Sequence, residues 1–306
     1  MELPVTSEVI NNINSCYSPS TPIANSIEYR FYCRYLYQKA ISVFKWDIPE
    51  TWNKTMFLLT LYSYGYVGIF RTGKYGVIYN PCTVGGRNIF YEPAYVMLAN
   101  PLLPELTGKQ MEIGTECALI RLTPDYMGIL DLIGFYAEKM ALASQGIDVN
   151  IINSKLAYVF SAKDATMAKS FKKMFDQITD GEPAVIVDKK LFNDDGSPNW
   201  QLFTQNLKQN YIANDLCNTM INIEAQFNSM VGIPNVNINK ASGVSAEEVN
   251  ANNTQTMTLA KLWLENIKIG IDQANSFYGL NLGVRLRFDE EVKQDEQRDA
   301  DNAGAV

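Results

Sequence analysis

The sequence predicts an α+β fold in which long helices flank a small region of short strands. Two observations predict this class. Apolar residues recur at helical spacing in several long segments before and after residues 66–122, whereas residues 66–122 alternate short apolar runs with turn residues. The chain has 306 residues, of which 47% are hydrophobic and 19% are charged, so it can bury a sizeable core.

The N-terminal region contains two predicted helices behind a polar arm. Residues 1–24 contain no Lys or Arg, and we expect them to form a flexible arm. Asn25 or Ser26 can cap the first helix, which stops before Trp46. The second helix follows Pro49 and ends near residue 64, because Gly65 suits the left-handed position after a helix.

A helix is predicted over residues 123–148, after the strands. Thr123 is a cap, Pro124 suits the first helical position, and Asp125 lies in the first turn. Gly146 can end this helix. Its apolar residues form two rows, so the helix needs neighbours on both flanks. One row is Ile129, Ile133, Tyr136 and Met140, and the other is Leu130, Ala137 and Ala141.

Residues 149–196 predict a compact strand–helix–strand unit, with strands at "LAYVFS" and "PAVIVD" around a helix at Lys163–Ile178. The longest helical pattern follows over residues 197–232. Asn214, Asn218 and Asn222 recur in it every four residues, away from its apolar row. An exposed helix normally carries Glu and Lys there. The row therefore indicates either a functional surface lined with amides or an ordinary solvated face.

The last third of the chain contains a long polar loop. Residues 233–244 are rich in Asn, Ser and Gly, and they exceed the usual connection of about 4–6 residues. A capping box at Ser245 begins a helix over residues 245–279. An alternating strand follows at 280–289, and a charged tail that we expect to be disordered occupies 290–306. The loop is a candidate functional segment.

The composition excludes several kinds of chemistry. The chain has no His, which removes Ser-His-Asp and Cys-His catalysis and His metal ligation. It has no phosphate-binding loop of the G-x-x-x-x-G-K-[ST] type, so we expect no ATP hydrolysis and no cofactor. Its net charge of -7 disfavours tight, non-specific binding to nucleic acid. Five scattered cysteines indicate reduced thiols, most simply buried ones.

No targeting or membrane signal is found. The N-terminus lacks a basic region followed by an apolar region, and no run of eighteen apolar residues occurs. We therefore expect neither secretion by a standard signal nor a membrane span.

The order of these elements, together with three short stretches, resembles a known family. The stretches are "YGYVGIF" from Tyr64, "GIPNVN" from Gly232 and "FYGLNLGVRLRFD" from Phe277. The chain resembles the portal proteins, and most closely the upper-collar or connector proteins of small phi-29-like podophages, over residues 26–291. The resemblance implies a dodecameric ring at the head–tail vertex of a virion, assembled in the host cytoplasm.

The resemblance also implies a part for each region. The ring would enclose a channel through which genomic double-stranded DNA is packaged and ejected. Its partners would be a packaging ATPase, a lower-collar or tail protein and the major capsid protein. The implied parts are outer helices (25–65), a β-rich wing with an SH3-like barrel (66–122 with 280–289), stem helices (123–148 and 197–232), a clip (149–196), a tunnel loop (233–244) and a long helix on the wing or crown side (245–279).

The tunnel loop would project into the channel, with the amide row of the second stem helix as a further channel-facing candidate. The candidate loop residues are Asn235, Asn237, Asn239, Lys240 and Ser242. Two departures from the family pattern stand out. Lys240 is the only charged residue of the loop, and the N-terminal arm lacks the basic residues that its relatives use to bind a packaging RNA, which disfavours RNA binding here.

Two alternatives remain open at this point. Another virion structural protein, such as a lower-collar or minor capsid subunit, would share this composition. A metal-dependent enzyme could use Asp194–Asp195 or Asp289–Glu291 to bind a divalent cation, although each cluster also suits a solvated turn. A closed ring with a central hole would separate a portal protein from both.

Overall fold

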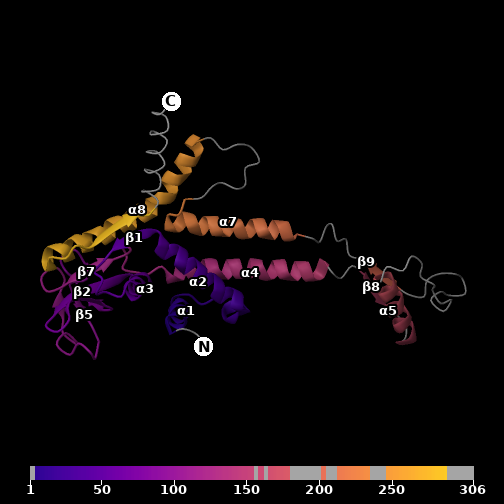
Figure 1. Ribbon diagram of the computed structural model, residues 1–306, viewed down its shortest axis with the longest axis horizontal. Helices are drawn as coiled ribbons and strands as arrows, with labels where there is room; N and C mark the ends of the chain where they lie inside the picture. Colours follow the sequence, from indigo (N-terminus) through magenta and orange to yellow (C-terminus); the bar gives the residue numbers. More distant parts are fainter. Residues whose placement is uncertain are drawn as a thin grey trace, which may run out of the picture. The chain divides into compact units, whose positions relative to one another are not determined.

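The computed structural model describes residues 4–154, 158–161, 165–179, 201–204, 212–234 and 246–287 (Figure 1). The chain divides into two compact units. The first comprises Met1–Leu142 and Met220–Val306, and the second comprises Ala143–Thr219. The helices α4 and α7 each have residues in both units.

The first unit begins with five elements: α1 (Pro4–Cys16), the 3-10 helix η1 (Pro22–Asn25), α2 (Ile27–Ser42), β1 (Phe44–Asp47) and α3 (Lys54–Tyr64). The predicted cap of α2 is confirmed, because the Ser26 side chain accepts a hydrogen bond from the Tyr29 amide at 3.0 Å. The predicted end of α3 is confirmed as well. Gly65 adopts a φ of 83°, the left-handed conformation that glycine takes without strain.

Within residues 4–24, the part of the predicted flexible arm that the structure describes, the prediction was wrong. Val9, Ile10 and Ile13 of α1 are buried in the main core. The segment after α1 is also bonded to Glu138, a buried residue of α4 (Leu130–Ser154). The Glu138 carboxylate accepts hydrogen bonds from the Tyr17 hydroxyl at 2.5 Å, from the Ser20 hydroxyl, and from both the amide and the hydroxyl of Thr21. Apolar burial and this carboxylate together order the arm.

The strand region forms two separate antiparallel sheets. The first has the order β3-β2-β7 and consists of β3 (Gly76–Asn80), β2 (Tyr66–Thr72) and β7 (Ala118–Arg121). The second has the order β4-β5-β6 and consists of β4 (Thr83–Gly85), β5 (Tyr95–Met97) and β6 (Met111–Glu112). Within the part of the chain that the structure describes, these strands do not close into the predicted SH3-like barrel.

The final strand, β10 (Gly283–Leu286), was predicted to join these sheets, but it pairs with β1. Phe44 lies opposite Leu286, and the Arg285 side chain donates to Asp47 at 2.8 Å. The sequence pattern had continued the preceding helix up to Trp46, and so had included Phe44 in it. Phe44 and Trp46 alternate with exposed residues instead, so their burial is that of a strand.

The predicted start of the helix near residue 123 was wrong, because α4 begins only at Leu130. The Asp125 carboxylate accepts a hydrogen bond from the Met127 amide at 3.2 Å, and the Ile129 amide donates to the Tyr62 carbonyl of α3 at 3.0 Å. These bonds hold the segment as a turn against α3. At its other end, α4 continues beyond Gly146 to Ser154.

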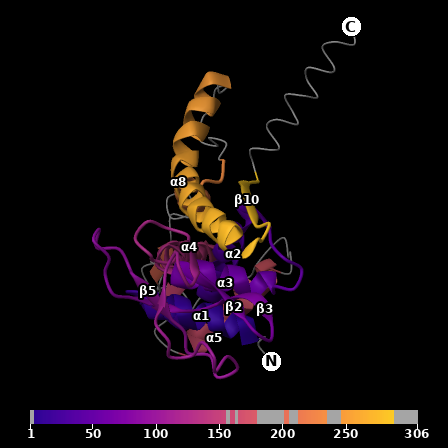
Figure 2. The same cartoon turned by 90° about the vertical axis from the view of Figure 1, so that its left-hand side faces the viewer.

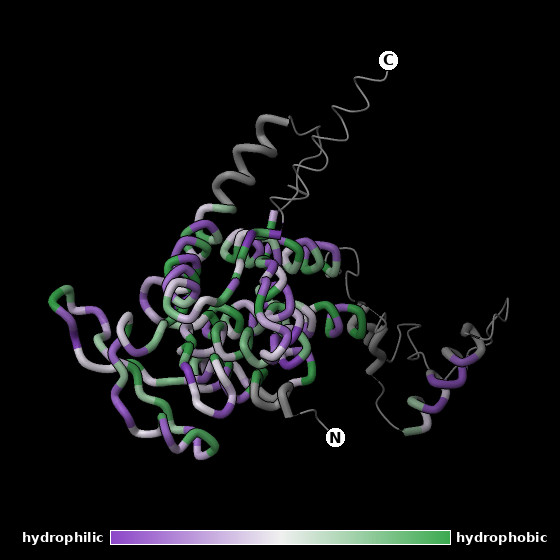
Figure 3. The backbone as a smooth tube through the Cα atoms, turned by 60° about the vertical axis from the view of Figure 1, so that its left-hand side comes forward, coloured by the Kyte–Doolittle hydropathy of each residue, from purple (hydrophilic) through white to green (hydrophobic). Residues whose placement is uncertain are grey.

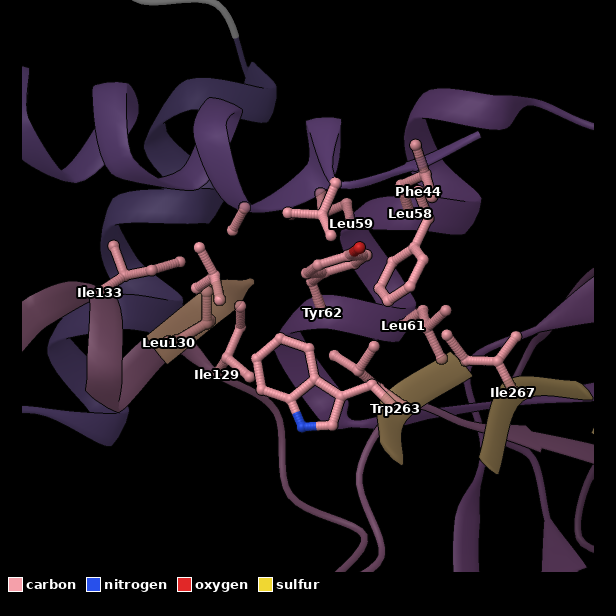
Figure 4. Close-up of a cluster of buried hydrophobic side chains, with 14 of the residues drawn as sticks. Phe44, Leu58, Leu59, Leu61, Tyr62, Ile129, Leu130, Ile133, Trp263 and Ile267 are labelled. Atoms are coloured by element: carbon pink, nitrogen blue, oxygen red, sulfur yellow. The ribbon is translucent and has the colours of Figure 1, made fainter. Parts of the chain in front are cut away.

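Both apolar rows of α4 are confirmed as buried, but their neighbours belong to the same chain. The seven residues of the two rows are at most 5% exposed. Figure 4 shows Ile129, Leu130 and Ile133 directed at Tyr62 and Leu59 of α3. The two rows are therefore used within the chain and leave no apolar flank of their own for a second copy.

The helix α8 (Ala246–Tyr278) confirms the long helix predicted over 245–279, and residue 245 itself lies outside the described residues. Figure 2 shows α8 rising beside β10. Trp263 and Ile267 of α8 complete the core around α3 (Figure 4). At Gly270 the helix crosses β7 so closely that a Cβ would lie 2.5 Å from the Leu119 carbonyl oxygen.

The second unit contains β8 (Tyr158–Ser161), α5 (Ala165–Thr179) and β9 (Gln201–Thr204). The predicted first strand and helix of this unit are confirmed. The predicted second strand, "PAVIVD", lies outside the described residues. β8 pairs antiparallel with β9, with Val159 opposite Phe203. The predicted helix start near residue 197 was therefore wrong, and α7 (Ala213–Val231) begins after this strand.

The five cysteines are free, as predicted. Cys33 and Cys117 are buried and Cys82 is half-buried, and burial raises the pKa of each of these thiols to about 12. Cys16 and Cys217 are exposed, so the simplest prediction of buried thiols fails for these two. Among the residues that the structure places, no helix is both long and apolar enough to cross a membrane.

The approach of α8 to β7 can be tested by Gly270→Ala. The added Cβ would meet strand backbone, so we expect the free energy of unfolding to fall by about 1–3 kcal/mol, the usual cost of overpacking. Gly146→Ala is the matched control inside a helix, because its Cβ would meet the Leu216 side chain at an ordinary 3.5 Å. Gly146→Ala should raise the free energy of unfolding by about 0.8–1 kcal/mol, because Ala has a higher helix propensity than Gly. Urea unfolding that shows both variants stabilised would contradict the close approach.

The Glu138 network predicts a pH dependence. Burial raises the pKa of Glu138, but the hydrogen bonds from Tyr17, Thr21 and Ser20 outweigh it, so the pKa lies below its usual value. Such a carboxyl stabilises the fold above its unfolded pKa and loses this contribution as the pH falls through the folded pKa. Wild-type stability should thus fall more steeply than that of Glu138→Gln between about pH 5 and pH 3. Urea midpoints that run parallel over this range would refute the network.

Candidate functional site

One side of α7 is fixed to the core of the first unit. Phe227 and Val231 are fully buried there. The Phe227 ring packs edge-on against Tyr136 of α4, with 5.7 Å between the ring centroids. These contacts determine which side of α7 faces the core.

The helix α2 covers the same side of α7 through polar contacts. The Tyr32 hydroxyl donates to the Met220 sulfur at 3.4 Å, and both the Tyr35 hydroxyl and the Lys39 ammonium donate to Glu224. Burial raises the pKa of Glu224, but the hydrogen bonds from Lys39 and Tyr35 lower it by a larger amount. The pKa of Glu224 therefore lies below its usual value. The Glu224 carboxylate is therefore ionised at neutral pH and links α7 to α2 through these hydrogen bonds.

The three asparagines predicted as a row lie on the opposite side of α7. Asn214, Asn218 and Asn222 are all exposed. Each residue turns an α-helix by about 100°, so Asn218 and Asn222 lie roughly 200° around from Met220 and Glu224. Gln226 is exposed and continues the row at the same spacing. Our sequence reasoning missed Gln226, although the four-residue period pointed to it.

This amide row carries little charge. Residues 212–234 contain two charged residues, Asp215 and Glu224, and Glu224 is held by Lys39. An amide side chain donates and accepts hydrogen bonds but has no net charge. The surface can therefore exchange hydrogen bonds with water or phosphate without the strong, salt-dependent retention that a row of Lys or Arg would produce.

The loop after α7 starts from a fixed point. Gly232 ends α7 with a φ of 83°, and a Cβ there would lie 2.3 Å from the Ala260 Cβ of α8. The Ile233 amide then donates to the Asn228 carbonyl at 2.8 Å, and the Ile233 side chain packs against the core. The predicted tip residues of the loop lie outside the described residues. They are Asn235, Asn237, Asn239, Lys240 and Ser242.

The acidic clusters suggested for an enzyme, Asp194–Asp195 and Asp289–Glu291, also lie outside the described residues. In the segments that the structure covers, no group of three or more His, Cys, Asp or Glu side chains could hold a metal ion.

A family model described as Phage Connector (GP10) matches residues 10–291, nearly the whole chain. The chain belongs to this family. The resemblance to connector proteins predicted from the sequence is thereby confirmed, and the connector is a portal protein of the head–tail vertex of a phage particle.

Several solved structures contain chains that are similar to this one. One, titled portal and tail of native bacteriophage P68, has 15% identity and a TM-score of 0.48, with 98% of both chains covered. A chain from the virion of a native gene transfer agent particle has 10% identity and a TM-score of 0.42, with 97% of the connector and 89% of that chain covered. An HK97 family phage portal protein from Corynebacterium diphtheriae has 11% identity and a TM-score of 0.33, with 90% of each chain covered. The assignment of the chain to the connector family rests on the match to the family model alone.

Proposed function

We propose that the connector assembles into a closed ring, a dodecamer, whose central channel conducts double-stranded genomic DNA during packaging and ejection. The family match over residues 10–291 is the observation that carries this proposal. The ring acts as a conduit and not as an enzyme. Nucleotide hydrolysis is supplied by a separate packaging ATPase.

The amide row of α7 lines the channel in this proposal. Its support is the exposure of Asn214, Asn218 and Asn222 on the side of α7 away from α2, together with the low charge of that side. A channel wall must let DNA slide, and each fixed phosphate contact strengthens retention. A wall of amides gives DNA and water hydrogen-bonding groups without fixing the duplex at one position.

The tunnel loop is the second channel element. Asn235, Asn237, Asn239, Lys240 and Ser242 project into the channel, and Lys240 provides one positive charge per subunit. The support is the attachment of Gly232 and Ile233 at the end of α7, the helix that carries the amide row. A loop that starts from the lining helix is placed to reach the channel.

The remaining regions serve as docking surfaces. The strand–helix–strand unit is the clip, which meets the packaging ATPase and later the lower-collar or tail protein. The sheets at 66–122 form the wing that faces the major capsid protein. The N-terminal arm binds no packaging RNA, and its lack of Lys and Arg supports this part of the proposal.

The ring is tested by negative-stain microscopy and light scattering of the purified chain without nucleotide. We expect closed rings with a central hole, because a conduit must form before the motor acts on it. A monodisperse monomer of 34.4 kDa at all concentrations would contradict the proposal.

The lining role of α7 is tested by Asn218→Lys combined with Asn222→Lys. The added charges should slow the release of DNA from the channel at low salt, because each neutralised phosphate steepens the salt dependence of log K by about 0.9. Release from single packaged heads at rising salt measures this effect, and high salt should restore the wild-type rate.

The matched control adds a charge at Gln38→Lys, an exposed position on α2. Because α2 covers the opposite side of α7, this variant should release DNA at the wild-type rate. Equal slowing in the variant and the control would show that α7 does not line the channel.

A further inference from the structure

The loop between β4 and β5 presents three large side chains to solvent. Ile89 is 86% exposed, and Phe90 and Tyr91 are each 76% exposed. Figure 3 shows loops with hydrophobic tips standing clear of the sheets. Single exposed apolar residues are common on proteins, but a contiguous apolar cluster of this kind marks an interaction site. We call residues 89–91 the apolar tip.

The loop that carries the apolar tip is held in one conformation. The Asn88 carboxamide oxygen accepts hydrogen bonds from the amides of Phe90 and Glu92, and the Asn88 amide donates to the Glu92 carbonyl. Tyr91 has a φ of 66°, which is uncommon for a residue with a side chain. Arg87 stabilises it by donating to the Tyr91 carbonyl at 2.9 Å and stacking over its ring. A preorganised loop loses little entropy when it binds.

A small hollow lies between α2 and α3 of the same unit. It has a volume of about 260 Å³ and is lined by Tyr37, Ile41, Lys54, Thr55 and Leu58. This volume is below the roughly 300–1,000 Å³ of small-molecule sites. The hollow is mostly apolar, so it suits one or two side chains from another protein better than a cofactor. We call it the α2–α3 hollow.

We propose that the apolar tip of one connector inserts into the α2–α3 hollow of the next copy around the ring. This inference rests on the proposed ring and names the contact that closes it. A ring with rotational symmetry is built from a head-to-tail contact, which requires two different complementary surfaces on each chain. The apolar tip and the α2–α3 hollow are such a pair.

The size and charge of the two surfaces support a second copy as the occupant. A fully buried aromatic side chain removes about 150–250 Å² from water, and Phe90 and Tyr91 are each 76% exposed, so the two together would bury roughly 230–380 Å². A standard interface needs about 800 Å² per partner, and this contact would supply about a third to a half of it. Glu92, at the base of the loop, pairs with Arg121 at 3.5 Å but remains half-exposed. Lys54, at the rim of the hollow, donates to the Trp46 carbonyl at 3.0 Å and is also exposed, so each group can still meet the opposite charge of the other on a second copy.

The test uses two single-surface variants of the full chain. Ile89→Ser with Phe90→Ser removes two of the three large side chains of the apolar tip and keeps Arg87 and Tyr91, whose contacts hold the loop. Thr55→Arg places a long charged side chain at the exposed edge of the α2–α3 hollow. Leu102→Ser is the matched control, because Leu102 is 79% exposed on a different loop. Circular dichroism and thermal unfolding confirm that each variant is folded.

We expect each surface variant to remain a folded monomer at concentrations where the wild type and Leu102→Ser form rings. A 1:1 mixture of the two variants should then form heterodimers but no rings, because one intact tip and one intact hollow remain in the mixture. Light scattering and negative-stain microscopy distinguish these species. Heterodimers that form in the mixture, but not from either variant alone, would show that the tip of one chain binds the hollow of another.

The outcomes separate this inference from the proposed function. If the wild type forms no rings, the proposed ring itself fails. If the wild type and both surface variants form rings equally well, the ring stands and the tip-in-hollow contact is refuted. If the variant rings are intact but no longer bind procapsid shells, the apolar tip contacts another virion protein, which also refutes the inference.

Discussion

The burial of the middle of α3 on every side is the constraint on which the rest of the first unit depends. Each residue from Phe57 to Ser63 is buried, so this part of α3 has no face for solvent, whereas its two ends are exposed. A helix that is apolar all round must be enclosed by other elements. The enclosing side chains come from distant parts of the chain, including Ile129 and Ile133 near the start of α4 and Trp263 and Ile267 in α8. Enclosing α3 therefore fixes where α4 and α8 lie.

That enclosure also decides which surfaces remain for function. Both apolar rows of α4 are consumed within the chain, so they cannot serve contacts between copies. α7 joins the core through Phe227 and α2 through Glu224, which leaves its amide row facing outward. The connector thus combines a core of ordinary apolar packing with one nearly uncharged exposed helix face and a rigid apolar loop. In the proposed function, the uncharged helix face would let DNA slide, and the apolar loop would hold a neighbouring chain.

Local signals in the sequence predicted a large part of the fold. The cap at Ser26 and the left-handed glycine at Gly65 depend on neighbouring residues, and each was confirmed. The amide row was visible as a four-residue period, and the structure extends it by Gln226. Boundaries failed where a distant partner competed with local preference. The segment after Thr123 carries good helix-start residues, but the hydrogen bond from the Ile129 amide to the Tyr62 carbonyl of α3 holds it as a turn.

The sequence by itself determined the class of fold, the identity of most helices, the lack of histidine chemistry and, through short stretches and element order, membership of the connector family. Each of these depends on residue type and on periods of two to four residues. Only the tertiary structure decided that Phe44 pairs with Leu286, that the N-terminal segment is bonded to Glu138, and that Ile89, Phe90 and Tyr91 remain exposed. These outcomes depend on which distant surfaces meet, because burial and hydrogen-bond satisfaction are properties of the whole folded chain and no local pattern encodes them.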